Sequence, residues 1–144
     1  MADYSSTPLI QKLGIKEGMK VLFVNTPENY KNLLGRLPEN IHEITSQQTK
    51  VDFIHFFTRS QEALREEFES LKNHLKLNGI LWISWPKSSC SFANSNLTEN
   101  VVRNIGLENG LVDVKIAAID EDWSGLKFVY RVKDRVYPLS LRTK

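Results

Sequence analysis

The sequence predicts a three-layer α/β domain in which a mostly parallel sheet lies between helices and ends in an antiparallel hairpin. Strand-forming apolar runs alternate with segments of helical periodicity along most of the chain, which favours parallel strands joined by right-handed crossovers. The runs at 21–24 and 51–57 are largely apolar at successive positions, as is typical of strands covered on both faces. Two strand-like segments, 111–118 and 125–132, then follow each other with only a turn between them.

The chain opens with a short predicted helix over residues 8–13. Thr7 is suited to be its N-cap, Pro8 its first helical residue and Gly14 its C-cap. A turn then leads into the first strand, at 21–24. We expect this strand to be buried on both faces, because every position in it is apolar.

A second helical stripe occupies residues 26–37, and two further strands follow it. The alternation of apolar and polar residues over 41–45 predicts a short edge strand. Residues 46–50 are polar and predict a loop, and 51–57 predicts a buried strand. These elements place two buried strands and one edge strand in the first part of the sheet.

The longest predicted helix begins after Ser60, which is a suitable N-cap. Its apolar positions recur at helical spacing, and acidic residues lie early and basic residues late, as the helix dipole favours. Asn78 and Gly79 are expected to end this helix, with a third buried strand over 80–85. The apolar stripe consists of Leu64, Phe68, Leu71 and Leu75.

A Ser- and Asn-rich loop over 86–96 precedes the last predicted helix, for which Asn96 and Glu99 have the spacing of a capping box. The closing hairpin pairs its strands around a turn at 120–122. We expect residues 1–134 to form a single domain and residues 135–144 to form a C-terminal tail.

Composition narrows the class of protein. The chain has 144 residues, 41% of them hydrophobic and 25% charged, with a net charge of +2. No apolar run is long enough to cross a membrane, and the N-terminus resembles no signal peptide, so we expect no membrane partner.

The single cysteine, Cys90, cannot form an internal disulfide, which fits a protein of the reducing cytoplasm. Basic residues are dispersed along the chain and cluster only in the C-terminal stretch. A nucleic-acid-binding surface usually concentrates positive charge more strongly, so a nucleic-acid module based on that stretch is the least favoured alternative.

This layout is Rossmann-like and resembles the class I methyltransferases over most of residues 8–132. The resemblance rests on residues 13–22 leading into the first strand, on 51–54, on 77–82 and on the final hairpin. The chain also resembles a family of small uncharacterised bacterial proteins, a domain of unknown function. That second resemblance rests on segments such as Ser84-Trp85-Pro86-Lys87 and Trp123-Ser124-Gly125, and it implies a fold but no known activity.

One departure from the methyltransferase pattern shapes the functional prediction. Methyltransferases of this class have a glycine-rich loop after the first strand, where the backbone approaches S-adenosylmethionine. Here residues 23–29 contain no glycine, Pro27 removes an amide donor, and no acidic residue clearly ends the second strand. We therefore expect no cofactor and a non-catalytic or regulatory domain that binds a ligand or protein partner. The alternative is a divergent S-adenosylmethionine-dependent methyltransferase-like enzyme.

Candidate ligand-binding residues follow from the rule that open parallel sheets bind ligands at the carboxyl ends of their strands. They could hold a small anionic ligand, with Lys87 as a point charge and Trp85 as a stacking face, or they could simply cap strand ends. The candidates are Asn25, Thr26, Asn29, Thr58, Trp85, Lys87 and Ser88.

Three further predictions concern Trp123, the histidines and the catalytic residues. Trp123 is either part of a partner surface or the rim of the core beneath a hairpin turn. His55 lies within an apolar strand and is expected to be a hydrogen-bonded core histidine. The three histidines share no metal-ligand spacing, so we expect no metal, and no catalytic residue is assigned.

Overall fold

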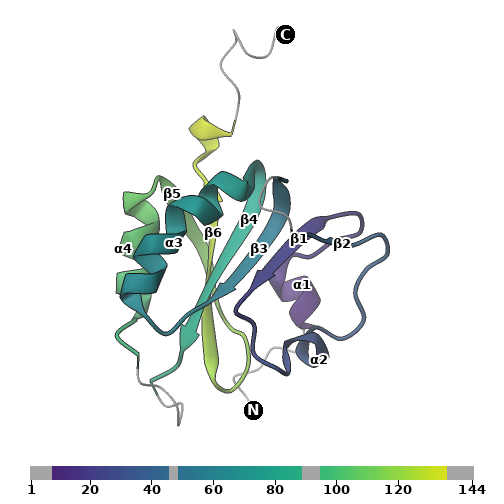
Figure 1. Ribbon diagram of the computed structural model, residues 1–144, viewed down its shortest axis with the longest axis horizontal. Helices are drawn as coiled ribbons and strands as arrows, with labels where there is room; N and C mark the ends of the chain where they lie inside the picture. Colours follow the sequence, from purple (N-terminus) through teal and green to yellow (C-terminus); the bar gives the residue numbers. More distant parts are fainter. Residues whose placement is uncertain (1–7, 46–48, 89–94, 136–144) are drawn as a thin grey trace, which may run out of the picture.

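The computed structural model describes residues 8–45, 49–88 and 95–135. In these segments six strands form one sheet in the order β2-β1-β3-β4-β6-β5. The first four strands in this order are parallel, and β6 is antiparallel to both of its neighbours. The predicted mixed sheet with a closing hairpin is therefore confirmed (Figure 1).

The strands correspond closely to the apolar runs of the sequence. They are β1 (Lys20–Val24), β2 (His42–Glu43), β3 (Val51–Phe57), β4 (Leu75–Pro86), β5 (Leu111–Ala118) and β6 (Trp123–Tyr130). The predicted edge strand is confirmed as β2, whose two residues are exposed at one border of the sheet. β5 forms the other border.

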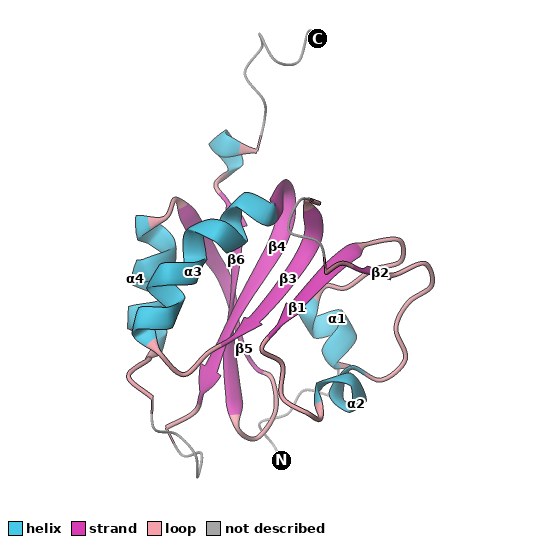
Figure 2. Cartoon of the chain, in the orientation of Figure 1, coloured by secondary structure: helices cyan, strands magenta, loops and turns pink. Residues whose placement is uncertain are grey.

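Helices cover both faces of the sheet (Figure 2). On one face, α3 (Gln61–His74) and α4 (Glu99–Glu108) enclose a core that contains Phe68 and Phe128. On the other, α1 (Leu9–Leu13) and α2 (Tyr30–Leu34) enclose a second core around Trp82. A 3-10 turn, η1 (Val132–Asp134), follows β6. None of the described helices has the length and apolarity to cross a membrane.

The predicted end of the long helix is wrong. α3 ends at His74, and Leu75 already begins β4, five residues before the expected strand start at Ile80. Leu75 continues the apolar stripe of the helix by spacing, but it is fully buried beside Val51 of β3. Pairing with β3 therefore overrides helical periodicity here, because a buried ladder satisfies the backbone as well as a further helical turn would.

The predicted capping box is also wrong. Thr98, not Asn96, caps α4, and its hydroxyl accepts a hydrogen bond from the Val101 amide at 3.2 Å. Asn96 instead accepts from the Gln61 amide at 2.8 Å, at the start of α3. The asparagine thus joins the starts of the two helices on one face, a long-range contact that local spacing cannot reveal.

Only Val21 of β1 is buried, whereas we expected the strand to be covered on both faces. The reason lies in the chain between β2 and β3, which contains no helix among its described residues. α3 consequently lies over β3 and β4, and Leu22 and Val24 are only partly buried at the edge of its core. The predicted tail falls outside the described residues apart from Arg135, so the boundary at 134 stays a prediction.

Candidate functional site

A cleft of about 590 Å³ opens at the carboxyl ends of β1 and β3. These strands are neighbours, and the chain leaves β1 toward β2 on one side while β3 leads toward β4 on the other. The cleft thus lies at the point where the strand order reverses, which is where open α/β sheets bind ligands. Its volume is in the usual range of small-molecule sites.

The bend after β1 forms one wall of the cleft. Asn25, the first residue beyond the strand, has a φ of 60°, in the left-handed region that glycine adopts most readily. Asparagine tolerates this conformation better than other non-glycine residues do. The bend therefore has a left-handed residue although it contains no glycine, and Thr26, Pro27 and Asn29 follow Asn25 along the same wall.

Replacing Asn25 tests this backbone assignment. We expect Asn25→Val to lower the free energy of unfolding by about 1–2 kcal/mol, because a β-branched residue is strained in the left-handed region. Asn25→Gly should leave it within about 0.5 kcal/mol of wild type, since glycine adopts the same φ without strain. Urea denaturation measures both variants, and equal stabilities would contradict the assigned conformation.

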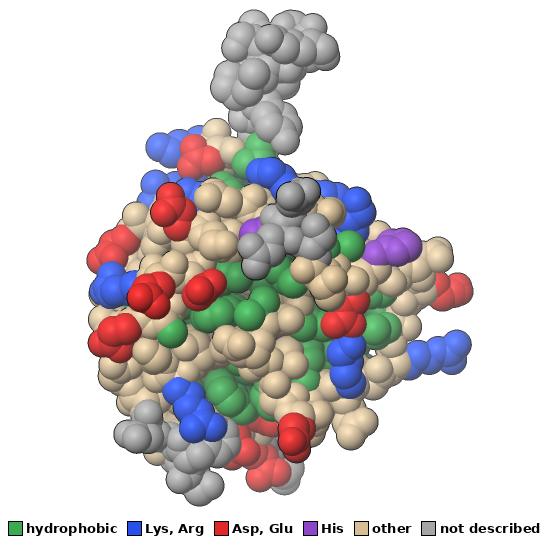
Figure 3. All heavy atoms as spheres, in the orientation of Figure 1, with side chains coloured by type: hydrophobic (Ala, Val, Ile, Leu, Met, Phe, Trp, Pro, Cys, Tyr) green, Lys and Arg blue, Asp and Glu red, His purple; other side chains and the backbone are tan. Residues whose placement is uncertain are grey.

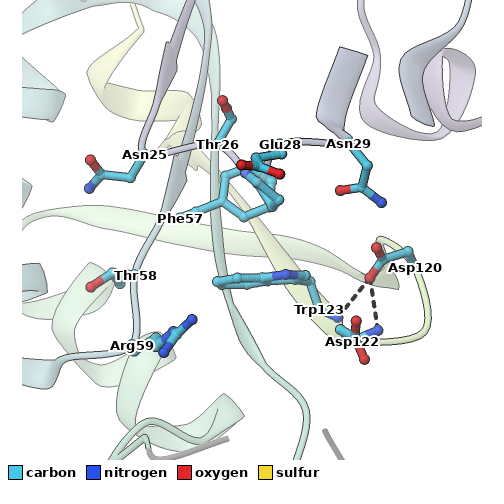
Figure 4. Close-up of a pocket in the computed structure, with 11 residues that line it drawn as sticks. Asn25, Thr26, Glu28, Asn29, Phe57, Thr58, Arg59, Asp120, Asp122 and Trp123 are labelled. Carbon is cyan, nitrogen blue, oxygen red and sulfur yellow. Dashed lines mark hydrogen bonds between the residues drawn. The ribbon is translucent and has the colours of Figure 1, made fainter. Parts of the chain in front are cut away.

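The turn between β5 and β6 forms the opposite wall (Figure 4). The Asp120 carboxylate accepts hydrogen bonds from the amides of Asp122 at 2.8 Å and Trp123 at 2.9 Å, which fixes the turn. Trp123 packs edge-on against Phe57 at the end of β3, with ring centroids 5.1 Å apart. These two aromatic rings line the cleft between the polar walls.

The charge of the cleft is predominantly negative. Its lining residues include the carboxylates of Glu28, Asp120 and Asp122 and one guanidinium, that of Arg59. A ligand with a positive centre would be attracted to such a lining, and an aromatic face adds to that preference. The small anionic ligand expected from the sequence is a poor match for this electrostatic environment.

A buried hydrogen-bonded network lies directly behind the cleft. The Tyr30 hydroxyl and His55 Nδ1 are 2.7 Å apart, and His55 Nε2 lies 2.7 Å from Ser84 Oγ. Phe57 stacks on the His55 ring at 4.1 Å and separates it from the cleft. Burial lowers the pKa of His55 to about 3, so the imidazole is neutral at neutral pH. Burial, with a smaller contribution from Glu43, raises the pKa of Tyr30.

The prediction of a hydrogen-bonded core histidine is therefore confirmed: His55 is fully buried and both ring nitrogens have partners. The sequence did not reveal those partners. Tyr30 comes from α2 and Ser84 from β4, so only the packing of α2 beneath the sheet brings them to one histidine.

The structure divides the predicted ligand-binding set in two. Asn25, Thr26, Asn29 and Thr58 line the cleft. The other three line a separate cavity of about 590 Å³ at the end of β4, beside the start of α4. These are Trp85, Lys87 and Ser88. A backbone hydrogen bond of 2.8 Å from Lys87 N to Asp122 O joins the borders of the two cavities.

The sequence missed several cleft residues. Glu28 adjoins predicted residues, so its neighbours were a usable signal, whereas Arg59 was expected at this edge beside Thr58. Asp120 and Asp122 were assigned only to a turn, because their position depends on β6 running antiparallel beside β4, which returns the turn to the carboxyl edge of the sheet.

Trp123 is only 8% exposed and belongs to the core around Trp82. Its assignment to a partner surface depended on an exposed ring, so the burial favours the alternative, the rim of the core beneath a hairpin turn. Cys90 lies outside the described residues. Within the described residues, no group of three or more His, Cys, Asp or Glu side chains is arranged to hold a metal ion.

Several solved structures that share this fold are S-adenosylmethionine-dependent methyltransferases. One from Aquifex aeolicus superposes with a TM-score of 0.60 at 18% identity, covering 83% of this chain and 86% of its own. A TehB-like methyltransferase from Corynebacterium glutamicum superposes with a TM-score of 0.53 at 8% sequence identity, covering 85% of each chain.

Fibrillarin from Aeropyrum pernix, solved with natively bound S-adenosyl-L-methionine, gives a TM-score of 0.56 at 14% identity, covering 81% of this chain and 69% of its own. The chain therefore has the methyltransferase version of the Rossmann-like fold. No protein-family model matches it, and no curated protein does. The resemblance to a small bacterial family of unknown function stays a prediction.

Proposed function

We propose that this chain binds S-adenosylmethionine in the cleft between β1 and β3 and is a divergent enzyme of the methyltransferase class. The observation that carries the proposal is the left-handed bend at Asn25, at the strand-order reversal of a methyltransferase fold. We expected no cofactor here, because the bend contains no glycine and Pro27 removes an amide donor. However, Tyr30 is buried behind the cleft, so it does not fill the space in front of the bend.

The residues present suit this ligand. S-adenosylmethionine has a sulfonium and an ammonium group, and the cleft offers carboxylates to both. Side-chain amides and a hydroxyl for its polar groups come from Asn25, Asn29 and Thr26, and the rings of Phe57 and Trp123 provide an apolar surface. When bound, S-adenosylmethionine supplies an electrophilic methyl group. This chain's residues would bind the cation, orient it and shield it from water.

A second candidate is a non-catalytic domain that binds a ligand or partner. It is favoured by Glu43, the last residue of β2, whose carboxylate pairs with Lys31 at 2.7 Å and does not line the cleft. A ribose-binding carboxylate at the end of the second strand is expected in dinucleotide-type folds. Binding and methyl transfer are therefore tested separately.

A thermal-shift titration tests binding. A ligand at a hundredfold excess over its dissociation constant stabilises the folded state by about 2.7 kcal/mol. We expect S-adenosylmethionine to stabilise the protein more than its neutral-sulfur product S-adenosylhomocysteine, and ATP to have no effect. Asp122→Asn should weaken the effect of S-adenosylmethionine, because it removes a cleft charge while keeping the side-chain shape.

Glu121→Gln is the matched control, since Glu121 is exposed beside Asp122 but does not line the cleft. Equal binding by the two variants would contradict the assigned site, and no stabilisation by S-adenosylmethionine would overturn the proposal. If S-adenosylmethionine binds, release of S-adenosylhomocysteine in the presence of a metabolite extract supports the enzyme. Binding without any release supports the non-catalytic domain.

A further inference from the structure

A cavity of about 500 Å³ lies at the amino ends of β3 and β4, away from the cleft, and is lined by basic residues. Lys50 precedes β3, Lys76 lies in the second position of β4, and Arg135 follows the turn after β6. Leu77 and Asn78 are the other described lining residues, and none of the described side chains of the lining is acidic. Figure 3 shows blue side chains gathered at the upper end of the molecule, where the described chain ends.

Sheet topology explains why these cations meet. β3, β4 and β6 are neighbours, and β6 runs antiparallel to β4. The carboxyl end of β6 therefore lies beside the amino ends of β3 and β4. This arrangement brings Arg135, from the basic C-terminal stretch, to Lys50 and Lys76, which are distant in sequence.

Two of the three cations, Lys50 and Arg135, form no ion pair with any described residue. Lys76 pairs with Asp52, with a nitrogen–oxygen distance of 3.2 Å. Arg135 uses only Nε, which donates to the Tyr130 carbonyl at 2.8 Å, so its two terminal nitrogens form no hydrogen bond with any described atom. Lys50 likewise has no ion pair within the described residues and is exposed. An open guanidinium edge beside a lysine matches the geometry and charge of a phosphate group.

We propose that this basic cavity binds phosphate groups, independently of the cleft between β1 and β3. The ligand is a phosphomonoester or a phosphodiester: Arg135 provides a paired donor edge and Lys50 a point charge, while Lys76 is already paired with Asp52. The phosphate could come from a free small molecule or from a nucleic-acid backbone, and the experiment below distinguishes these sources. A site of this kind gives the domain a second ligand at the amino ends of β3 and β4, remote from the cleft at the carboxyl ends of β1 and β3.

The test measures binding of pyrophosphate and of a fluorescent single-stranded oligonucleotide by the full chain. We expect Arg135→Gln and Lys50→Gln each to weaken binding about tenfold, the effect of losing one charge-assisted hydrogen bond. For the oligonucleotide, each substitution should also reduce the slope of log K against log salt by about 0.7. Arg36→Gln is the matched control, because Arg36 is exposed and does not line the cavity.

Binding of pyrophosphate alone supports a small phosphate ligand, and binding of the oligonucleotide with the stated salt slope supports a nucleic-acid backbone. The proposal is overturned if neither probe binds at low salt, or if Arg135→Gln and Lys50→Gln bind as the Arg36→Gln control does. All three substituted side chains are exposed, so a thermal unfolding curve suffices to verify that the variants fold.

Discussion

Lowering the pH from 7.5 to 4.5 is expected to reduce the free energy of unfolding by about 2–3 kcal/mol through His55 alone. The pKa of this histidine is lowered to about 3 in the folded protein by complete burial, against 6.5 for the model value. The imidazole of His55 therefore binds a proton near pH 6.5 in the unfolded chain but only near pH 3 in the folded chain. Stability is complete above the unfolded pKa and is lost progressively as the pH falls toward the folded one.

Urea denaturation at a series of pH values measures this effect. His55→Gln introduces an amide that can form hydrogen bonds and removes the titrating imidazole, so the stability of the variant should depend less steeply on pH across this window. Phe57→Leu is the matched control, because it weakens the same aromatic cluster without removing a proton-binding group. A His55→Gln variant with the wild-type pH slope would contradict the assignment of a neutral, buried imidazole.

Trp82→Ala is expected to lower the free energy of unfolding by about 3–5 kcal/mol. The side chain is fully buried in β4, and its Nε1 donates a hydrogen bond of 2.8 Å to the Leu13 carbonyl at the end of α1. Truncation leaves a large cavity and a carbonyl without its partner. Because natural domains have only about 5–15 kcal/mol of stability, this loss would be a large fraction of the total.

Chemical denaturation monitored by far-UV circular dichroism measures the loss. If Trp82→Ala does not fold, Trp82→Phe keeps most of the ring volume and isolates the indole hydrogen bond, with an expected loss of about 1–2 kcal/mol. Leu107→Ala is the control, because Leu107 is 39% exposed on α4. A Trp82→Ala loss no larger than that of Leu107→Ala would show that α1 is not anchored through this ring.

Local chemistry in the sequence was enough to predict most elements. Ser60 caps α3 as expected, with its hydroxyl accepting from the Ala63 amide at 3.1 Å. Gly14 ends α1 in the left-handed conformation. The segment 51–57 forms β3 with the predicted bounds. For the two caps the determining interaction lies within a few residues along the chain, and for β3 a run of apolar residues is sufficient to predict the strand.

Predictions failed where a distant partner decides the outcome. Leu75 fits the helical stripe of α3 but pairs with Val51 in the sheet. Asn96 has cap spacing for α4 but binds the start of α3. The bend after β1 lacks the glycine of the methyltransferase pattern, and only the structure shows that Asn25 takes the left-handed φ there. Neither pairing across the sheet nor the φ of one asparagine can be read from local composition.

By itself, the sequence determined the alternation of strands and helices, the closing hairpin and four of the residues that line the cleft, because hydrophobic periodicity and strand-end position are properties of short segments. Only the tertiary structure decided what the cleft contains besides those four. The antiparallel course of β6 places acidic residues at one edge of the sheet and Arg135 at the other. The physical reason is that charge acts through space, and residues far apart in the chain become neighbours only when the sheet is assembled.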